Sequence, residues 1–466
     1  MLTAINIIKL ILLVSLGLLF FIGQGWLVTG PLLHGHLIKR TKNIPYFQEL
    51  SITLISGLII NYGVVLIFHS LRNSLLACTI LAIIGLVCYS VMFIKDVKLK
   101  TFSWNSIIKI FGVLLTCVLF IGPVMFIPLY GTDWDARSIW FLHAKMVYYA
   151  GSFSLSSGWL HPSVYFSHPD YPNLVPTLAA QIPYVFGFWN EYLPKASLFF
   201  LIIPAIMMIF SFYRRSFSFL VLMILIPFSF SSKLWNGYMD GHLTLYFALS
   251  LLLLGRYIKN SKPIDLISSA FCLLILIYLK NEGLLAALSG TLAICLTVIL
   301  MKIKISIRVL IKDYWKYLVG LLVILIPFGL WNLYKHQWGL TNDLAIGVSD
   351  TLKQFLTRIT DGSYKLIIGN VHDQLNDGLM IFGFLLFGSL ALKKRIPREI
   401  IPILFASLIY CLGIIAIYMI TPYDLVWHLH TSVARTILTA TVGLYVASFY
   451  LLINFENKED KTFNSW

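Results

Sequence analysis

The chain has 466 residues, of which 59% are hydrophobic and only 12% are charged, and its mean hydropathy is +0.84. Soluble domains carry charge on roughly a quarter of their residues, so this composition excludes an ordinary soluble protein. The formal net charge of +15 is compatible with two partners, a nucleic acid and an anionic membrane surface. The distribution of the basic residues along the chain decides between them.

The apolar residues form runs, and most of these approach the ~20 residues that a helix needs to cross a bilayer. We therefore expect an all-α polytopic membrane protein. The run 175–188 contains Pro176 and Pro183 and precedes Pro194, so we expect it to lie at the interface as a short helix. Thirteen crossings remain, at about 4–22, 49–69, 75–94, 107–130, 196–213, 217–231, 242–257, 264–279, 284–301, 317–334, 378–392, 400–420 and 433–453.

Basic clusters occupy short connections between these runs, at 39–42, 95–100, 214–215, 256–262, 302–316 and 393–395. By the positive-inside rule these connections are cytoplasmic, which places the N-terminus outside and the tail 454–466 inside. Two long loops, 131–195 and 335–377, then face the outside. Nearly all of the basic excess lies on the cytoplasmic side, which indicates attraction to anionic lipid and excludes a nucleic-acid partner.

The stretch 131–137, with the sequence GTDWDAR, directly follows an apolar run. Its two carboxylates and its guanidinium therefore sit where hydrocarbon ends, and ionisable residues at that depth are costly enough to suggest function. We expect Asp133 and Asp135 to occupy the cap and first turn of a helix, where the helix dipole keeps a carboxylate ionised as a base. The alternative is structural: Asp133 caps the helix and Asp135 pairs with Arg137.

The residues after Asp135 predict an amphipathic helix that lies on the membrane. Their apolar side chains recur at spacings of three, four and three, which is the period of one helix face. These side chains are Ile139, Leu142, Met146 and Tyr149.

The stretch 168–176 holds three prolines in nine residues and cannot form a regular helix. It predicts a rigid turn that presents His168, Asp170 and Tyr171. A turn with a purely structural role is the alternative.

Three further polar patches lie at the outer ends of later runs, at 237–242, 278–283 and 423–435. Charge at one depth on one face is what a shared interfacial cavity requires. In these patches Lys280, His428 and Arg435 are candidate ligands for an anion such as phosphate. For Lys280 the alternative is a structural ion pair with Glu282.

Metal binding has the weakest support in the sequence. His428 and His430 are two residues apart and so do not share a helical face. Asp135 and Asp240 remain able to hold a divalent cation, Mg²⁺ or Mn²⁺, against phosphate oxygens. We expect no dedicated metal site, and the absence of GxxxxGK[ST] and GxGxxG patterns gives no support to a nucleotide-driven pump.

Together these patches resemble bacterial membrane glycosyltransferases of the GT-C superfamily, whose relatives by fold include protein O-mannosyltransferases and the aminoarabinose transferases that modify lipid A. The resemblance divides the chain into N-terminal transmembrane helices (1–106), a catalytic transmembrane core (107–453) and the tail. The chain differs from better-known relatives because three predicted spans precede the span that leads into the catalytic loop. The motifs that carry it are 133–140 with Lys145, 168–172, 237–240, 279–283, and 427–432 with Arg435.

The resemblance implies an inverting transfer from a polyprenyl-phosphate sugar, in which an aspartate of the first large outer loop is the base. Asp135 matches that aspartate best, Asp133 less closely, and Asp240 matches a second acidic position. The acceptor would be an envelope glycan, lipid or protein outside the bacterial inner (plasma) membrane. The implied donor-phosphate ligands are Lys280, Arg435, His428 and Lys145, and the implied cavity residues are His168, Asp170, Tyr171, Glu282 and Trp427.

Two other functions fit parts of the sequence. A transporter or flippase of lipid-linked sugars would need polar groups or broken helices near the midplane. Lys9, Asn61 and Gln181 are too few to form such a site. A polymerase or ligase of lipid-linked sugars would rely on outer-loop arginines and histidines, whereas the paired aspartates of 131–137 point to a base.

Overall fold

The computed structural model describes residues 4–33, 45–96, 104–128, 132–154, 158–159, 161–212, 217–301, 307–342 and 350–456. Within these ranges the chain is all-α, as predicted, with 18 α-helices and no strand beyond an isolated bridge between Ser70 and Ser152. Most of the predicted tail, from 457 on, lies outside the described residues, as do residues 343–349 and the basic clusters at 39–42, 97–100, 214–215 and 302–306.

Most helices coincide with an apolar run of the sequence. The bounds of the helices are α1 (Ala4–Leu33), α2 (Tyr46–Phe68), α3 (Leu71–Asp96), α4 (Trp104–Met125), α5 (Phe141–Ala150), α6 (Leu174–Phe186), α7 (Ser197–Phe210), α8 (Phe217–Met223), α9 (Ser231–Trp235), α10 (Met239–Asn260), α11 (Pro263–Leu276), α12 (Glu282–Leu300), α13 (Ile307–Gln337), α14 (Thr351–Thr360), α15 (Tyr364–Ala391), α16 (Ile400–Ile420), α17 (Leu425–Thr436) and α18 (Leu438–Glu456). Helix α14 and the first half of α15, by contrast, lie within the predicted outer loop 335–377.

Eleven helical segments of the described chain are long and apolar enough to cross a membrane, so the chain is a polytopic helical membrane protein. The prediction of thirteen crossings exceeds this number by two shorter apolar helices, Phe217–Phe228 and Pro263–Leu276. The second of these has 14 residues and is about 21 Å long, and together with residues 277–280 it returns the chain to the level of Asp240 at the start of α10. The segment that was predicted to lie at the interface, α6, is also short.

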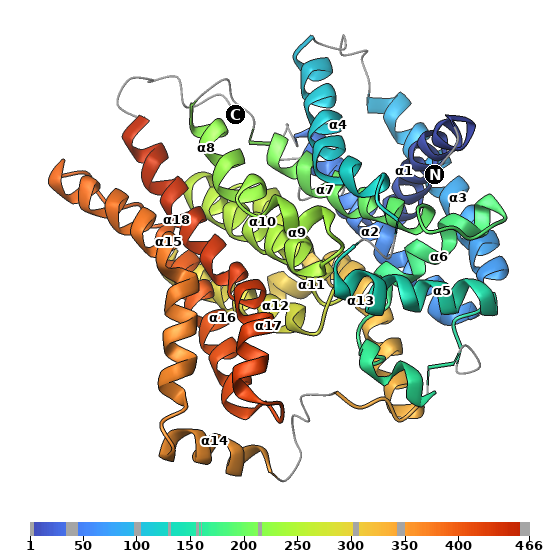
Figure 1. Cartoon of the computed structure of the whole chain (residues 1–466). Coiled ribbons are helices and arrows are strands. Elements are labelled where there is room, and N and C mark those ends of the chain that lie inside the picture. The colour runs from blue at the N-terminus through green and yellow to red at the C-terminus, as the bar shows by residue number, and fades with distance from the viewer. Residues whose placement is uncertain are drawn as a thin grey trace.

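Three helices form the buried centre of the fold. In α2, α7 and α10 between 83% and 94% of the apolar window is buried, whereas most other spans expose much of their surface. Figure 1 shows α10 near the middle of the molecule, with α1, α2 and α3 on one side and α15, α16 and α18 on the other. Helix α10 packs on α7, α11, α12 and α18, so it connects the N-terminal and C-terminal helices.

The helix predicted after Asp135 is present, and its stripe runs from the protein core to the surface: Ile139 is buried, Leu142 and Met146 are half-buried, and Tyr149 is exposed. A π-helical turn, Ala136–Trp140, leads into α5, which packs on α6. The buried side chains of α5 include His143, Ala144 and Val147, whereas Tyr149 of the predicted stripe is exposed. This placement fits an interfacial helix with one side against protein and the other toward lipid.

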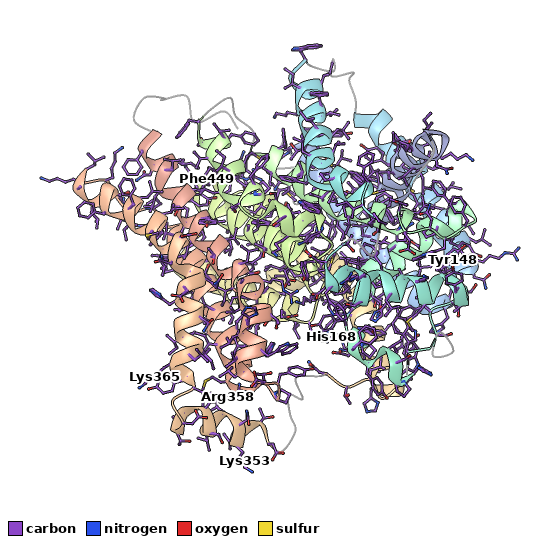
Figure 2. All side chains as sticks on the ribbon, in the orientation of Figure 1. Tyr148, His168, Lys353, Arg358, Lys365 and Phe449 are labelled. Carbon is purple, nitrogen blue, oxygen red and sulfur yellow. The ribbon has the colours of Figure 1, made fainter. Side chains whose placement is uncertain are left out.

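Helix α14 lies within the predicted outer loop 335–377, where no helix was predicted. Its Leu352, Leu356 and Ile359 are exposed at helical spacing, while Arg358 is buried. Arg358 donates hydrogen bonds to the backbone oxygens of Tyr418 and Thr421, at the end of α16. Figure 2 labels Arg358 and Lys353 on this helix, which lies at the lower edge of the view. The buried arginine therefore holds an amphipathic helix against the helix bundle.

Candidate active site

Five ionisable side chains that the sequence analysis singled out form one buried network. Nη1 of Arg435 lies 2.6 Å from Oδ2 of Asp135 and 3.5 Å from Oδ2 of Asp240. Nζ of Lys280 lies 3.0 Å from Oδ1 of Asp240 and 3.1 Å from Oε1 of Glu282. We call these five residues the ion cluster. It joins four segments of the chain through alternating charges.

Each member of the ion cluster lies at or beside the end of a helix. Asp135 directly precedes the π-helical turn, Asp240 is in the first turn of α10, and Arg435 is in the last turn of α17. Lys280 lies between α11 and α12, and Glu282 begins α12. π-Helical turns are uncommon and occur frequently at functional sites, so the backbone before Trp140 supports a functional reading of Asp135.

Gly237 allows the two aspartate segments to approach each other. Its φ is +91°, and a Cβ at this position would lie 2.4 Å from Cβ of Ala136. A larger residue would therefore clash with the residue that follows Asp135, in addition to the backbone strain. Gly237 thus allows the 237–242 patch to pack closely against the segment that carries Asp135.

The ion cluster holds three carboxylates and two cations, so it carries one net negative charge when all five groups are ionised. Asp135, Asp240 and Lys280 are each at most 7% exposed, which makes every unpaired charge costly. Burial opposes the charged form of Lys280, but the attraction of Asp240 and Glu282 outweighs it and raises the pKa of this amine. The two predicted phosphate ligands in the ion cluster, Lys280 and Arg435, are thus engaged by carboxylates.

Two polar atoms of the ion cluster have no hydrogen-bond partner within the described part of the chain. They are Nε of Arg435 and Oε2 of Glu282, and both are buried. Buried polar atoms are nearly always satisfied, so one donor and one acceptor left open in the same network favour a site that receives a ligand.

Tyr238 belongs to the 237–240 motif but was not among the predicted site residues. The guanidinium of Arg435 lies 4.3 Å from the centre of its ring. Burial raises the pKa of the Tyr238 hydroxyl, and the positive charge of Arg435 opposes that shift. A cation over an aromatic face is stabilised by the ring, so Tyr238 supports Arg435. An aromatic residue two positions before a candidate aspartate was the available signal.

The predicted turn at 168–171 joins the ion cluster from the side. Oδ2 of Asp170 accepts a hydrogen bond from Asn281 at 2.7 Å, and Asn281 lies between Lys280 and Glu282. The rings of His168 and Tyr171 are stacked, with centroids 4.8 Å apart, and Trp140 lies 5.7 Å from Tyr171. The turn therefore places an aromatic group beside the segment that carries Lys280.

His143 is buried beneath this turn. Its Nδ1 lies 3.2 Å from Oδ1 of Asn173 and its Nε2 lies 2.9 Å from Oγ of Ser167. Burial lowers the pKa of His143 to about 3, so the imidazole is neutral near pH 7. No local sequence pattern marks this histidine, because its partners Ser167 and Asn173 are distant in the chain.

The other predicted site residues lie around the cluster or away from it. Asp133 is exposed, and Lys145 forms a surface ion pair with Glu191 at 3.8 Å. His428 bonds Thr421 at 2.9 Å and lies seven residues from Arg435, about 10 Å away on the same face of α17. Trp427 is exposed. Lys145 and His428 thus lie outside the ion cluster, and their predicted contacts with a donor phosphate stay predictions.

No group of three or more His, Cys, Asp or Glu side chains suited to a metal ion occurs in the ranges that the structure describes. Asp135 and Asp240, which the sequence offered to a divalent cation, are bridged by the guanidinium of Arg435.

Family models, curated proteins and solved structures were each compared with the chain, and none matches it.

Proposed function

We propose that the chain is an inverting glycosyltransferase, which moves a sugar from a polyprenyl-phosphate donor to an acceptor hydroxyl at one membrane face. The observation that carries the proposal is the ion cluster, in which the buried carboxylate of Asp135 lies 2.6 Å from Arg435. A base for the hydroxyl and cations for the departing phosphate are the two requirements of this transfer. The cluster supplies both from distant segments of the chain.

In the proposed reaction Asp135 takes the proton of the acceptor hydroxyl. The acceptor oxygen attacks the anomeric carbon on the side opposite the phosphate, and the bond between that carbon and the phosphate oxygen breaks. The phosphate leaves with the electron pair. Arg435 and Lys280 stabilise its negative charge through charge-assisted hydrogen bonds. The sugar is thereby transferred with inversion.

Arg435 has a donor that is free to contact the donor phosphate. Its Nη1 is engaged by Asp135 and Asp240, whereas its buried Nε has no hydrogen-bond partner among the described residues. In the proposed complex this N–H donates to a phosphate oxygen of the sugar donor, so the same guanidinium contacts both the base and the leaving group.

Aromatic side chains around the ion cluster are suited to hold a sugar. Tyr238 lies against Arg435, and Tyr171 follows Asp170, which accepts a hydrogen bond from Asn281. Trp134 and Trp427 are exposed on the segments that carry Asp135 and Arg435. Interfacial tryptophans also anchor membrane proteins, so the two roles compete for Trp134 and Trp427. The acceptor in this proposal is an envelope glycan, lipid or protein on the external face.

The test compares transfer by the purified full chain with that of two variants, given a polyprenyl-phosphate monosaccharide and candidate acceptors. Asp135→Asn removes the proposed base, and we expect its rate to fall by about 10²–10⁴-fold. Asp133→Asn is the matched control, because it changes an exposed carboxylate two residues away. Undiminished transfer by Asp135→Asn would contradict the proposal. Release of polyprenyl diphosphate instead of monophosphate would favour a polymerase or ligase.

A transporter of lipid-linked sugars has less support. Asn61 and Gln181, the polar residues that would serve it inside the helices, donate to each other at 2.9 Å and 3.2 Å. Their amide groups are thus used by the fold, and they hold α2 against α6.

A further inference from the structure

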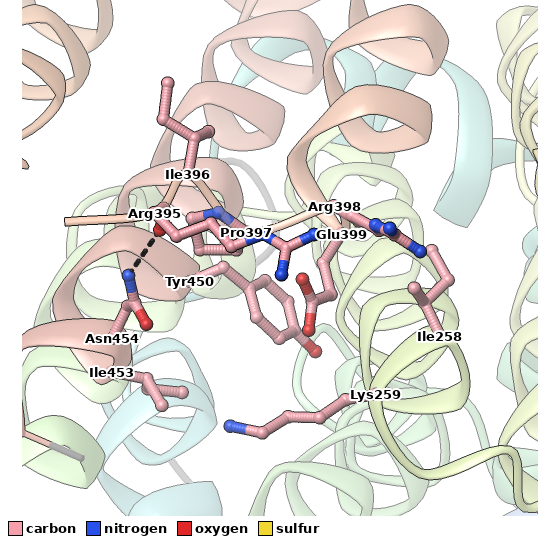
Figure 3. A pocket seen from close by; sticks show the side chains of 10 residues that line it. All are labelled: Ile258, Lys259, Arg395, Ile396, Pro397, Arg398, Glu399, Tyr450, Ile453 and Asn454. Carbon is pink, nitrogen blue, oxygen red and sulfur yellow. Dashed lines mark hydrogen bonds between the residues drawn. The ribbon is translucent and has the colours of Figure 1, made fainter.

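A second polar site lies at the other end of α10, in a cavity of about 420 Å³. Figure 3 shows Lys259 on one side of it and Arg395 and Arg398 on the other, with Tyr450 and Glu399 between them. Asp240 and Lys259 are nineteen residues apart on α10, so the cavity and the ion cluster are separated by about 28 Å along this helix. That distance is close to the hydrocarbon thickness, which places the cavity at the opposite membrane face.

Two basic clusters that are distant in the sequence meet in this cavity. Lys259 belongs to the cluster at 256–262, and Arg395 belongs to the cluster at 393–395. Among the described residues no carboxylate lies within 4 Å of the guanidinium of Arg395 or Arg398. Arg256, by contrast, lies 2.7 Å from Asp265 and donates to Gln48 at 2.8 Å. The charge of Arg256 is therefore neutralised within the fold, whereas the guanidinium groups of Arg395 and Arg398 are available to bind a ligand.

The walls of the cavity are fixed to one another. The Tyr450 hydroxyl donates to the backbone oxygen of Leu252 at 2.5 Å, and a Cβ on Gly255 would lie 2.5 Å from the tyrosine ring. Nδ2 of Asn454 donates to the backbone oxygen of Arg395 at 2.7 Å, shown as a dashed line in Figure 3. Helix α18 is therefore held to α10 and to the loop that carries the two arginines, so the cavity is formed before a ligand enters.

We propose that this cavity binds a phosphate group, in the first instance that of an anionic phospholipid headgroup. Three cations and one carboxylate give it a charge of +2, which suits a single phosphate. Arginine side chains bind phosphate through paired hydrogen bonds, and basic pockets between helices at a membrane face collect anionic headgroups. Ile396, which lines the cavity and is exposed, provides an apolar contact for the acyl chains. This inference does not depend on the proposed transferase activity.

The experiment measures binding of short-chain phosphatidylglycerol to the full chain in phosphatidylcholine nanodiscs. We expect the double variant Arg395→Gln/Arg398→Gln to bind about tenfold more weakly, because two charge-assisted contacts are lost. The matched control is Lys353→Gln/Lys365→Gln, which also removes two exposed positive charges. Figure 2 labels these lysines at the lower edge of the molecule and Phe449, beside Tyr450, in its upper part. The control is expected to bind as the wild type does.

A parallel titration with inorganic phosphate distinguishes the two sources of the ligand. Tight binding of the lipid with weak competition by phosphate indicates a headgroup site. Binding of phosphate alone that the arginine variant loses indicates a soluble phosphate at the same site. Equal losses in the two double variants would overturn the proposal, as would wild-type binding by the arginine variant. Thermal unfolding in phosphatidylcholine confirms that each variant is folded.

Discussion

The charged side chains near the two ends of α10 differ in burial and in pairing. At one end Asp240 is 4% exposed and lies between Lys280 and Arg435. At the other end Arg395 and Arg398 are exposed and have no carboxylate within 4 Å in the described chain. A buried charge is tolerated only with its partner, whereas an exposed one is stabilised by water and headgroups. The same residue types therefore contribute to the fold at one end and are available to a ligand at the other.

The largest difference should come from removing one arginine at each end. Arg435→Met leaves Asp135 and Asp240 without their shared cation, and we expect it to lower the free energy of unfolding by about 3–5 kcal/mol. Arg398→Met should change this free energy by less than ~0.5 kcal/mol, since it is a surface substitution. Denaturant unfolding in detergent measures both. Equal effects would show that the two ends do not differ in this way.

A double-mutant cycle sharpens the comparison at the level of one pair. Asp240→Leu and Lys280→Met should each destabilise the protein, and the double variant should lose less than their sum by about 3 kcal/mol, the upper range for paired residues. The same cycle on Arg395 and Glu399 should give a coupling near zero. Unfolding of the four variants of each cycle provides the values. A coupling below ~0.5 kcal/mol at Asp240 would mean that the ion pair contributes no stability.

Acid should destabilise the end that carries the ion cluster through His143. The pKa of this histidine is 6.5 when unfolded and about 3 when folded, so the unfolded state binds the extra proton first. Its stabilising effect is complete above pH 6.5 and is lost as the pH falls toward 3, by up to about 1.4 kcal/mol per pH unit. Hydrogen exchange of 161–174 between pH 7 and 4 measures this. His143→Gln should flatten the dependence, and an unchanged slope in that variant would exclude His143 as its cause.

The smallest effect is expected at Lys145, the predicted phosphate ligand that pairs with Glu191 at 3.8 Å. Both side chains are about 40% exposed, and exposed ion pairs contribute about 0–1 kcal/mol. Lys145→Ala should therefore change both stability and sugar transfer little. A loss of transfer comparable with that of Lys280→Met would return Lys145 to the site.

One contact of the ion cluster follows from the sequence by simple geometry. Asp240 precedes the connection at Ser261 by twenty-one residues and Lys280 follows it by nineteen, on two consecutive antiparallel helices. A helical hairpin with arms of similar length brings such residues to the same level. The pairing of Asp240 with Lys280 could therefore have been predicted from the sequence. The contact between Asp135 and Arg435 spans 300 residues, and sequence reasoning could only place both residues at the same predicted membrane face.

Several assignments required the packed structure. Sequence periodicity identified the helix after Asp135 and its stripe, but only the fold showed that Tyr149 is exposed while His143 is buried. It also gave Asp135 a partner in Arg435, 2.6 Å away, which local sequence could not indicate. Side-chain partners across helices depend on how the helices cross, and no local pattern encodes that.

The sequence by itself determined the class of the protein, its apolar helices and the polar patches at their ends, because hydrophobic runs and costly charges are local properties. The tertiary structure alone decided which charges meet. It neutralised Lys280 and Arg435 with three carboxylates, and it brought Lys259, Arg395 and Arg398 into one cavity. The physical reason is that charge pairing depends on distances of a few ångströms between segments that are far apart along the chain.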